Sequence, residues 1–240
     1  MHRPFSGYRN IVVLTGAGVS VASGLRPFRG PDGVWTEFNV EEYGHVDALS
    51  TQPDKMWQLL GPLRAMSSAA RPNAAHRALA DFEAALKPDQ RFLLVTQNVD
   101  GLHQRARSKN VAELHGNIHR TICSAGCGLP MFDDTRSYFE SVPRCPHCGA
   151  VLRPDIVLFG EPVAVNASWK AKKALRDCDL FLAIGTSGLV SPASNFVRAA
   201  QYAGAHTVYV NLEPLALPNH EFAQTILGRA EDLLPRLLTH

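Results

Sequence analysis

The sequence lacks any hydrophobic run long enough to cross a membrane. Its longest apolar stretches, IVVLTGAGV from Ile11 and LFLAIGTSGLV from Leu180, contain Gly and Thr. They fall well short of the ~20 apolar residues that a membrane-spanning helix needs. The N-terminal segment MHRPFSGYRNIVV also lacks the small-residue cleavage site of a secretory signal peptide. We therefore expect a cytoplasmic protein that has no membrane partner.

The chain also has little net charge, no low-complexity tract and no evident internal repeat. Its formal charge is +2 over 240 residues, and Lys and Arg are scattered rather than gathered in one stripe. This pattern does not indicate a nucleic-acid partner. With 45% hydrophobic residues, the composition is typical of an ordinary globular protein. The length suits one large domain or a domain with a smaller insertion.

Cysteines are few, but four of the 5 have a distinctive spacing. A disulfide framework is not expected, because thiols stay reduced in the cytosol. Two short pairs, spaced C-x3-C and C-x2-C, can instead place four thiolates around one Zn²⁺, and a site closed in this way is structural rather than catalytic. His147 is the one competing ligand between them. The predicted zinc ligands are Cys123, Cys127, Cys145 and Cys148.

A strand, a glycine-rich turn and a helix start are predicted from the segment NIVVLTGAGVSVASG, which begins at Asn10. Backbone N–H groups exposed at such a turn can bind a phosphate. The segment lacks the third glycine of the full dinucleotide fingerprint near Val21, so the motif alone is only moderately specific. It indicates a nucleotide-binding arrangement.

Further strands are predicted over 91–98, 180–187 and 206–213, and a helix over 73–86. Each strand ends in small or polar residues, and ligands collect at the carboxyl ends of parallel strands. The expected fold class is α/β, a Rossmann-like doubly wound parallel sheet with an inserted small zinc-ribbon module. We expect the nucleotide-binding domain to comprise 1–118 and 156–240, the zinc module 119–155, and part of 36–75 to form a helical segment of the small domain.

Seven motifs in one order resemble those of the sirtuins, the NAD-dependent protein-lysine deacylases. They are GAGVS with FRGPDGVW, TQNVDGLH, ELHG, the four cysteines, LRPDIVLFGE, GTSGLVSPA and VNLEP. Together they span nearly the whole chain. The resemblance implies that NAD and an acyl-lysine peptide or protein substrate enter a cleft between a Rossmann-like domain and a zinc-ribbon domain.

The resemblance also implies roles for individual residues. His115 would be the general base that accepts a proton from a ribose hydroxyl, and Asn98 would join it as a catalytic residue. The backbone near 157–161 would pair with the substrate peptide as a strand, with the contacts assigned to Val157, Phe159, Gly160 and Glu161. The implied NAD-binding residues are Gly16, Ala17, Gly18, Ser20, Phe28, Arg29, Trp35, Gln97, Asn98, Asp100, Gly185, Thr186, Ser187, Asn211, Glu213 and Ala230.

The chain departs from some family members in the segment that would contact the acyl group. Sirtuins of the bacterial branch that act on acidic acyl groups carry a Tyr-x-x-Arg pair before the PNAAH-like segment, and no tyrosine lies between Met56 and Pro72 here. We therefore expect acetyl rather than succinyl, although a shift of Arg64 into the pocket would reverse this. ADP-ribosyl transfer, NAD hydrolysis, other deacylation and non-catalytic NAD sensing remain open alternatives.

Overall fold

The computed structural model describes residues 5–26, 40–187, 193–215 and 220–239. Within them, a six-stranded parallel sheet has the strand order β3-β2-β1-β7-β8-β9. Its strands are β1 (Asn10–Thr15), β2 (Arg91–Thr96), β3 (Val111–Glu113), β7 (Leu180–Ile184), β8 (His206–Asn211) and β9 (Gln224–Leu227). The strands grow outward in one direction from β1 and in the other from β7. The topological switch point therefore lies between β1 and β7, where open α/β sheets bind ligands.

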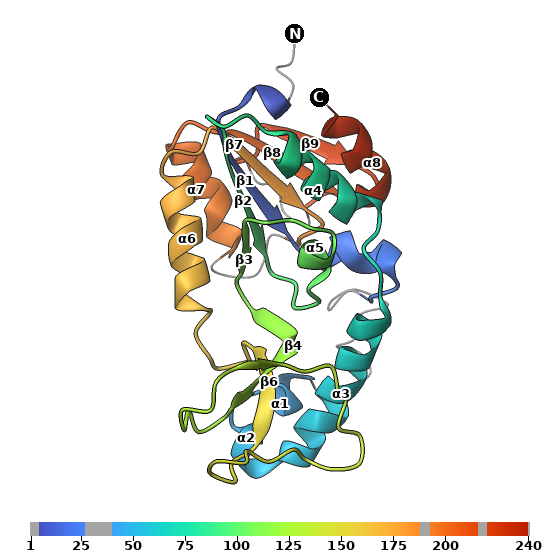
Figure 1. Cartoon of the computed structure of the whole chain (residues 1–240). Helices are drawn as coiled ribbons and strands as arrows, with labels where there is room; N and C mark the ends of the chain where they lie inside the picture. The colour runs from blue at the N-terminus through green and yellow to red at the C-terminus, as the bar shows by residue number, and fades with distance from the viewer. Residues whose placement is uncertain (1–4, 27–39, 188–192, 216–219, 240) are drawn as a thin grey trace.

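Helices cover both faces of this sheet, because successive residues of each buried strand point to opposite sides. On one face Ile11 and Val13 pack with α4 (Ala74–Ala85) and α8 (Ala230–Leu237). On the other face Val12 and Leu14 pack with α6 (Val165–Leu175) and α7 (Phe196–Tyr202). Figure 1 shows these two helical layers on either side of the sheet. The predicted doubly wound α/β fold is confirmed.

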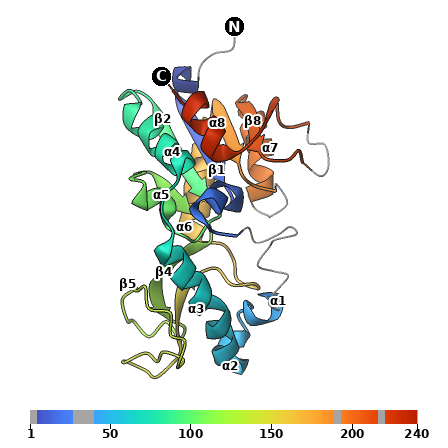
Figure 2. The ribbon, with the colours of Figure 1, turned by 90° about the vertical axis from the view of Figure 1, so that its right-hand side faces the viewer.

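A second, antiparallel sheet of three strands, in the order β5-β4-β6, lies beyond the end of the parallel sheet. It is formed by β4 (Gly116–Cys123), β5 (Phe132–Asp133) and β6 (Leu152–Ile156). Near it lie α1 (Val40–Tyr43), α2 (Ala48–Thr51) and α3 (Pro53–Ala69), which share a small apolar core with Leu158. Figure 2 shows the same arrangement from the side. Within the described residues, no helix is both long and apolar enough to cross a membrane.

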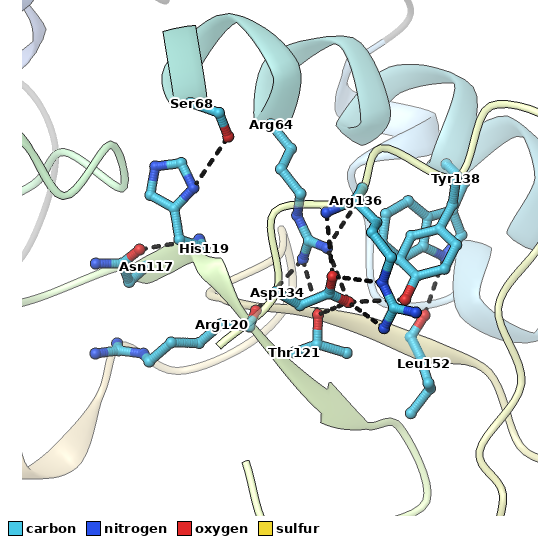
Figure 3. Close-up of polar contacts among 11 residues, drawn as sticks. Arg64, Ser68, Asn117, His119, Arg120, Thr121, Asp134, Arg136, Tyr138 and Leu152 are labelled. Atoms are coloured by element: carbon cyan, nitrogen blue, oxygen red, sulfur yellow. Dashed lines mark hydrogen bonds and ion pairs between the residues drawn. The ribbon is translucent and has the colours of Figure 1, made fainter. Parts of the chain in front are cut away.

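Helix α3 is fixed to the small sheet by the fully buried side chain of Arg64 (Figure 3). The guanidinium donates to the Arg136 carbonyl at 3.1 Å and to the Thr121 hydroxyl at 3.0 Å. It also lies 3.5 Å from the Asp134 carboxylate. That carboxylate accepts further hydrogen bonds from Arg136 Nε and the Tyr138 hydroxyl. Arg64 is therefore committed to a buried ion-pair network, and the expected alternative in which it swings toward an acyl group would have to break that network.

Gly61 lets the chain at Ser137 approach α3 closely. A Cβ atom at this position would lie 2.4 Å from the Ser137 carbonyl oxygen, much closer than real Cβ contacts. The glycine one turn before Arg64 therefore admits the backbone that Arg64 then binds. Nearby, Trp57 donates from Nε1 to the Leu152 carbonyl at 3.0 Å and so joins α3 to β6.

The predicted elements agree with the structure in position, with differences at their ends. The strands predicted over 91–98 and 206–213 end two residues earlier, and the strand predicted over 180–187 ends three residues earlier, because their last residues turn away to form the site. Residues 17–23 after β1 form a 3₁₀ helix (η2, Ala17–Ser23) rather than an α-helix. The expected domain boundaries stay a prediction, although β4 and β6 of the small sheet extend to 116 and 156.

Candidate functional site

The turns after β1 and β7 meet backbone to backbone at the switch point. Gly18 donates its N–H to the Gly185 carbonyl at 2.9 Å, and Gly16 donates to the Ile184 carbonyl at 3.0 Å. A Cβ on Gly16 would lie 2.7 Å from the Gly185 oxygen, and one on Gly185 would lie 2.6 Å from Val19 N. Gly185 also has a φ of +60°, which favours glycine. These glycines are thus required by close packing of the two turns, apart from any contact with a phosphate.

Asn98, Ser20 and Asp100 form a buried polar cluster beside these turns. Asn98 Nδ2 donates to the Gly16 carbonyl at 3.0 Å and to Ser20 Oγ at 3.2 Å. Ser20 Oγ in turn donates to the Asp100 carboxylate at 2.7 Å. Burial raises the pKa of Asp100, while hydrogen bonds from Leu102 N and Ser20 oppose the rise. The structure therefore brings three of the predicted NAD-binding residues into one hydrogen-bonded group.

A second group joins β2, β7 and β8. Gln97 Nε2 donates to Thr186 Oγ1 at 3.0 Å, and the Thr186 carbonyl accepts from the Tyr209 hydroxyl at 3.0 Å and from Asn211 Nδ2 at 3.4 Å. Glu213 is exposed. The pKa of Tyr209 is raised, chiefly by burial and to a smaller extent by the charge of Glu213. These predicted residues thus surround the carboxyl ends of neighbouring strands.

The remaining predicted NAD-binding residues differ in how they are placed. Ala17 opens η2 and Ser187 is exposed at the end of a described segment. Ala230 begins α8 and is only 7% exposed, within the same apolar core as Val19. Phe28, Arg29 and Trp35 lie outside the described residues.

His115 lies between the two groups that the sequence assigned to NAD and to the substrate. Its Nδ1 is 2.8 Å from the Gln97 carbonyl, and its own carbonyl accepts from Val157 N at 2.9 Å. Because a carbonyl can only accept, Nδ1 carries the proton in the neutral ring and Nε2 keeps a free lone pair. Burial lowers the pKa of His115, and the hydrogen bond to Gln97 opposes this. The ring therefore has the tautomer that a general base needs.

The buried histidine His103, which is not among the predicted site residues, supports this site through hydrogen bonds. Thr15 Oγ1 donates to Thr96 Oγ1 at 2.9 Å, so its oxygen is the acceptor for His103 Nε2, 3.0 Å away. Thr96 Oγ1 also accepts the backbone N–H of Asn98 at 3.1 Å. Burial lowers the pKa of His103 well below its ordinary value, which keeps the ring neutral. This chain of hydroxyl groups fixes the backbone at Asn98.

His76 is a second buried histidine in this region. Its ring centroid lies 4.8 Å from that of His103, and its Nε2 lies 3.5 Å from Ser20 Oγ. Its Nδ1 accepts the Asn73 N–H in a capping box at the start of α4. His76 ends the motif PNAAH and His103 ends the motif TQNVDGLH. The burial of the two rings and the contact between them follow only from the tertiary fold.

The predicted substrate segment uses most of its N–H groups inside the chain. Val157 donates to the His115 carbonyl, Phe159 to the Gly44 carbonyl and Glu161 to the Leu158 carbonyl. The Phe159 carbonyl accepts from Val46 N at 2.9 Å, which makes an isolated parallel bridge at His45.

The Glu161 carboxylate is also engaged within the chain. It accepts two hydrogen bonds from Arg153, at 2.6 and 2.8 Å, and one from Leu158 N. Burial raises the pKa of Glu161 but is outweighed by these donors, which leave it lowered. Its side chain therefore holds the segment in shape, and the substrate contacts expected here stay a prediction.

The four predicted zinc ligands converge. Their sulfur atoms all lie within 4.8 Å of one another, with Cys123 and Cys148 3.6 Å apart and Cys127 and Cys145 3.5 Å apart. A tetrahedral Zn²⁺ with Zn–S bonds of about 2.3 Å needs sulfur atoms ~3.8 Å apart, so the set fits the metal. The cluster found in the described residues does not include His147. The four cysteines are positioned to bind one structural zinc ion.

A family model described as "Sir2 family" matches residues 16–192 of the chain. An NAD-dependent protein deacylase of Aquifex aeolicus is 42% identical over 85% of this chain and 84% of its own length. NAD-dependent protein deacetylase 1 of Pyrobaculum aerophilum is 40% identical, covering 95% and 88%. The chain belongs to the Sir2 family. The resemblance found in the sequence is thereby confirmed.

A solved Sir2 structure with a deacetylated p53 peptide and 3'-O-acetyl ADP ribose superposes on the chain with a TM-score of 0.83, 28% identity and coverage of 96% and 92%. The matched range of the Sir2 model takes in the glycine turn, Asn98, His115 and the zinc cysteines. Asn211, Glu213 and Ala230 lie beyond it. The NAD-binding roles of these three residues stay a prediction.

Proposed function

We propose that this Sir2-family chain is an NAD-dependent protein-lysine deacetylase that releases nicotinamide, O-acetyl-ADP-ribose and free lysine. The observation that carries the proposal is the position of His115. Its ring is hydrogen-bonded to the Gln97 carbonyl, and the Gln97 side chain donates a hydrogen bond to Thr186 at the switch point. The His115 carbonyl accepts a hydrogen bond from Val157 N in the segment assigned to the substrate. One residue thus links the two halves of the reaction.

The donor set at the ends of β1, β2, β7 and β8 suits a dinucleotide. It combines close-packed glycine turns with side-chain amides, hydroxyls and a carboxylate, the groups that bind phosphates and ribose hydroxyls. When bound, NAD supplies the ADP-ribose that accepts the acyl group and releases nicotinamide. Gln97, Asn98 and Asp100 would contact its nicotinamide ribose and carboxamide, and Asn211 and Glu213 its adenosine end.

His115 would accept the proton of a ribose hydroxyl at Nε2. The Gln97 carbonyl holds Nδ1–H, so the free lone pair is fixed at the opposite ring nitrogen. Because burial lowers the pKa of the ring, the neutral, basic form predominates at pH 7. The bond from Val157 N to the His115 carbonyl then ties the base to the segment beside which the acyl-lysine would lie.

Acetyl is the acyl group that the described residues favour. Leu59 and Leu60 of α3 are buried in the apolar core that also contains Leu158, and Leu63 packs against it. Arg64 offers no rescue, because its guanidinium is held by Asp134 and Thr121. A succinyl carboxylate would leave water without a cationic partner, at a cost of at least ~2 kcal/mol. We expect kcat/KM to be about ten-fold or more higher for acetyl-lysine than for succinyl-lysine.

One assay tests the proposal against its alternatives. Purified protein and NAD are incubated with one peptide carrying acetyl-, succinyl- or longer acyl-lysine, and all products are followed by mass spectrometry. Deacetylation yields free lysine and O-acetyl-ADP-ribose in equal amounts. ADP-ribose on a protein, ADP-ribose without peptide turnover, or NAD binding without any product would each replace the proposal by one of the other functions. Equal rates on acetyl and succinyl peptides would contradict the acyl preference alone.

A further inference from the structure

The outer face of α6 combines exposed apolar and basic side chains. Val165 is 75% exposed and Trp169 is 60% exposed, both high for large apolar residues. Between 165 and 176 the chain has four cations and no carboxylate. All four cations are exposed: Lys170, Lys172, Lys173 and Arg176.

Most of these side chains lie in one sector of the helix. At 100° per residue, positions 165, 169, 172, 173 and 176 fall within about 100° of one another. The inner face, formed by Ala167, Ala171 and Leu175, packs against the core of the parallel sheet. Lys173 Nζ lies 5.1 Å from the centre of the Trp169 ring, so the cation and the indole form one continuous surface. We call the exposed residues Val165, Trp169, Lys172, Lys173 and Arg176 the α6 face.

The α6 face begins next to the catalytic histidine. Ala164 donates its N–H to the carbonyl of Leu114, the residue before His115, at 3.2 Å. Ser168 then donates to the Ala164 carbonyl and continues the first helical turn. Val165 follows the predicted substrate segment, which ends at Glu161, by only four residues. In Figure 1, α6 runs along the outer edge of the molecule from the level of the small sheet toward the far end of the parallel sheet.

The face has a direction. Its apolar members, Val165 and Trp169, are at the end near His115, and its cations are at the far end. At 1.5 Å per residue, the centres of the two groups lie about 10 Å apart along the helix, which is about three residues of extended peptide. Cations in the last turn also suit the helix dipole, but the dipole does not account for an exposed tryptophan beside them.

We propose that the α6 face binds an acidic segment of the protein substrate outside the acyl-lysine. The proposal rests on the proposed deacetylase function. The segment would place an apolar residue over Val165 and Trp169 and, about three residues further from the acyl-lysine, carboxylates against Lys172, Lys173 and Arg176. Charge complementarity favours a short acidic peptide. Three cations on one helix of 11 residues would neutralise only a few phosphates of a duplex.

The test compares acetyl-lysine peptides that differ only in an extension. One extension carries a Leu followed three residues later by three Glu, and its control carries Gln in place of each Glu. Each extension is placed once before and once after the acetyl-lysine, and a short peptide without extension is the reference. We expect one Glu peptide to show kcat/KM at least five-fold above its Gln control at 50 mM salt, chiefly through KM, with most of this advantage lost at 300 mM salt.

Matched variants then locate the effect. The double variant Lys172→Glu/Lys173→Glu should abolish the advantage of the Glu peptide over its Gln control. Trp169→Ala should raise KM for both extended peptides, because both carry the Leu. Each variant should leave the short peptide within two-fold of wild type. The control, Lys87→Glu/Lys109→Glu, makes the same charge change at two exposed lysines outside α6 and should keep the advantage. Equal values for Glu and Gln peptides in both positions, or equal losses in the two double variants, would overturn the proposal.

Two further readouts separate this proposal from others. If no peptide is turned over, the deacetylase function fails, and binding of the labelled Glu and Gln peptides by fluorescence anisotropy still tests the α6 face. A 20-bp duplex or anionic vesicles that bind in an α6-dependent way, while the Glu peptide does not, would assign the face to a different partner and refute an acidic peptide.

Discussion

At the scale of single residues, the tautomer of His115 decides what the ring can do. The Gln97 carbonyl requires a proton on Nδ1, and this leaves Nε2 as the only nitrogen that can accept one. Asparagine at 115 can place its Nδ2 donor close to the position of Nδ1. This substitution therefore keeps a donor for the Gln97 carbonyl while it removes the basic nitrogen.

We expect His115→Asn to keep the fold and lose at least about 100-fold in kcat/KM on acetyl-lysine peptide, because general-base catalysis contributes roughly that much or more. Thermal unfolding should stay within a few degrees of wild type, and NAD affinity, measured by calorimetry, within a few-fold. Replacement of the exposed His220 by Asn is the control and should have no effect on activity. Activity of His115→Asn near that of wild type would remove His115 from the mechanism.

The residues of the site were partly predictable from the sequence. The glycines and Asn98 stand at the ends of predicted strands, so their meeting at one sheet edge could be expected. His115 was selected through the resemblance of its ELHG motif to the family, without a predicted strand before it. The support behind them could not. His103 is linked to Asn98 by hydrogen bonds through Thr15 and Thr96, which stand on two strands far apart in the chain, and no local pattern reports that contact.

At the scale of elements, α3 shows why strands and helices were easier to predict than their partners. Its helical form follows from residues 53–69, and its interior Pro62 does not end it. The sequence left open a shift of Arg64 toward the acyl group. The structure directs it to Asp134 instead, because a buried guanidinium needs a carboxylate and carbonyl acceptors, which the small sheet supplies.

We expect Arg64→Ala to lower the free energy of unfolding by about 3 kcal/mol, because it removes one partner of a buried ion pair and leaves a cavity. Urea unfolding measures this. Burial lowers the pKa of Arg64 while the charge of Asp134 opposes the shift, so the pair, rather than either residue, carries the effect. In a double-mutant cycle, Asp134→Asn should cost much less once Arg64 is absent. Independent, additive costs would contradict the network.

At the scale of the whole molecule, the zinc site holds the small sheet together. Cys123 ends β4, and Cys145 and Leu152 pack in the same apolar cluster, so the metal would join segments that have little other core. A structural zinc of this kind contributes its binding free energy to folding. The small sheet also bonds α3, and α3 carries the Ser67 hydroxyl that bonds the Asp100 carbonyl at 3.2 Å. Loss of the metal should therefore also disturb the predicted NAD-binding residue Asp100.

We expect one zinc per chain by metal analysis, and loss of both zinc and cooperative unfolding after strong chelation. Cys145→Ser should give metal-poor, poorly soluble protein, because Cys145 is buried and its thiolate is lost. Cys178→Ala is the matched control: this cysteine is buried beside Leu180, away from the cluster, and its replacement should leave zinc content unchanged. Freshly purified, active enzyme without zinc would refute the assignment.

Stability of the whole molecule should fall in mild acid because several histidines are buried in their neutral form. Burial, and secondly the charge of Arg77, lower the pKa of His76 to about 4, and burial also lowers the pKa of His103 well below its ordinary value. The unfolded chain takes up protons near pH 6.5 that the folded chain refuses. Unfolding is therefore favoured as pH falls from 6.5 toward 4, and no contribution remains above 6.5. Asp100, whose pKa burial raises, acts in the opposite sense.

Replacement of His76 isolates one part of this dependence. Because the pKa of His76 is lowered from an ordinary value of 6.5 to about 4, wild-type protein should lose roughly 3 kcal/mol of its unfolding free energy between pH 7 and pH 4 through His76 alone. His76→Asn loses the buried ring, so its stability should be lower than that of wild type at pH 7. Because asparagine cannot take up the proton, its stability should decline less steeply toward pH 4. Urea unfolding at pH 7, 6, 5 and 4.5 measures the two slopes. His220→Asn, at an exposed position, is the control and should follow wild type. Parallel curves for wild type and His76→Asn would mean that the His76 ring is protonated in the folded protein, and the proposed neutral contact with Ser20 and His103 would then be wrong.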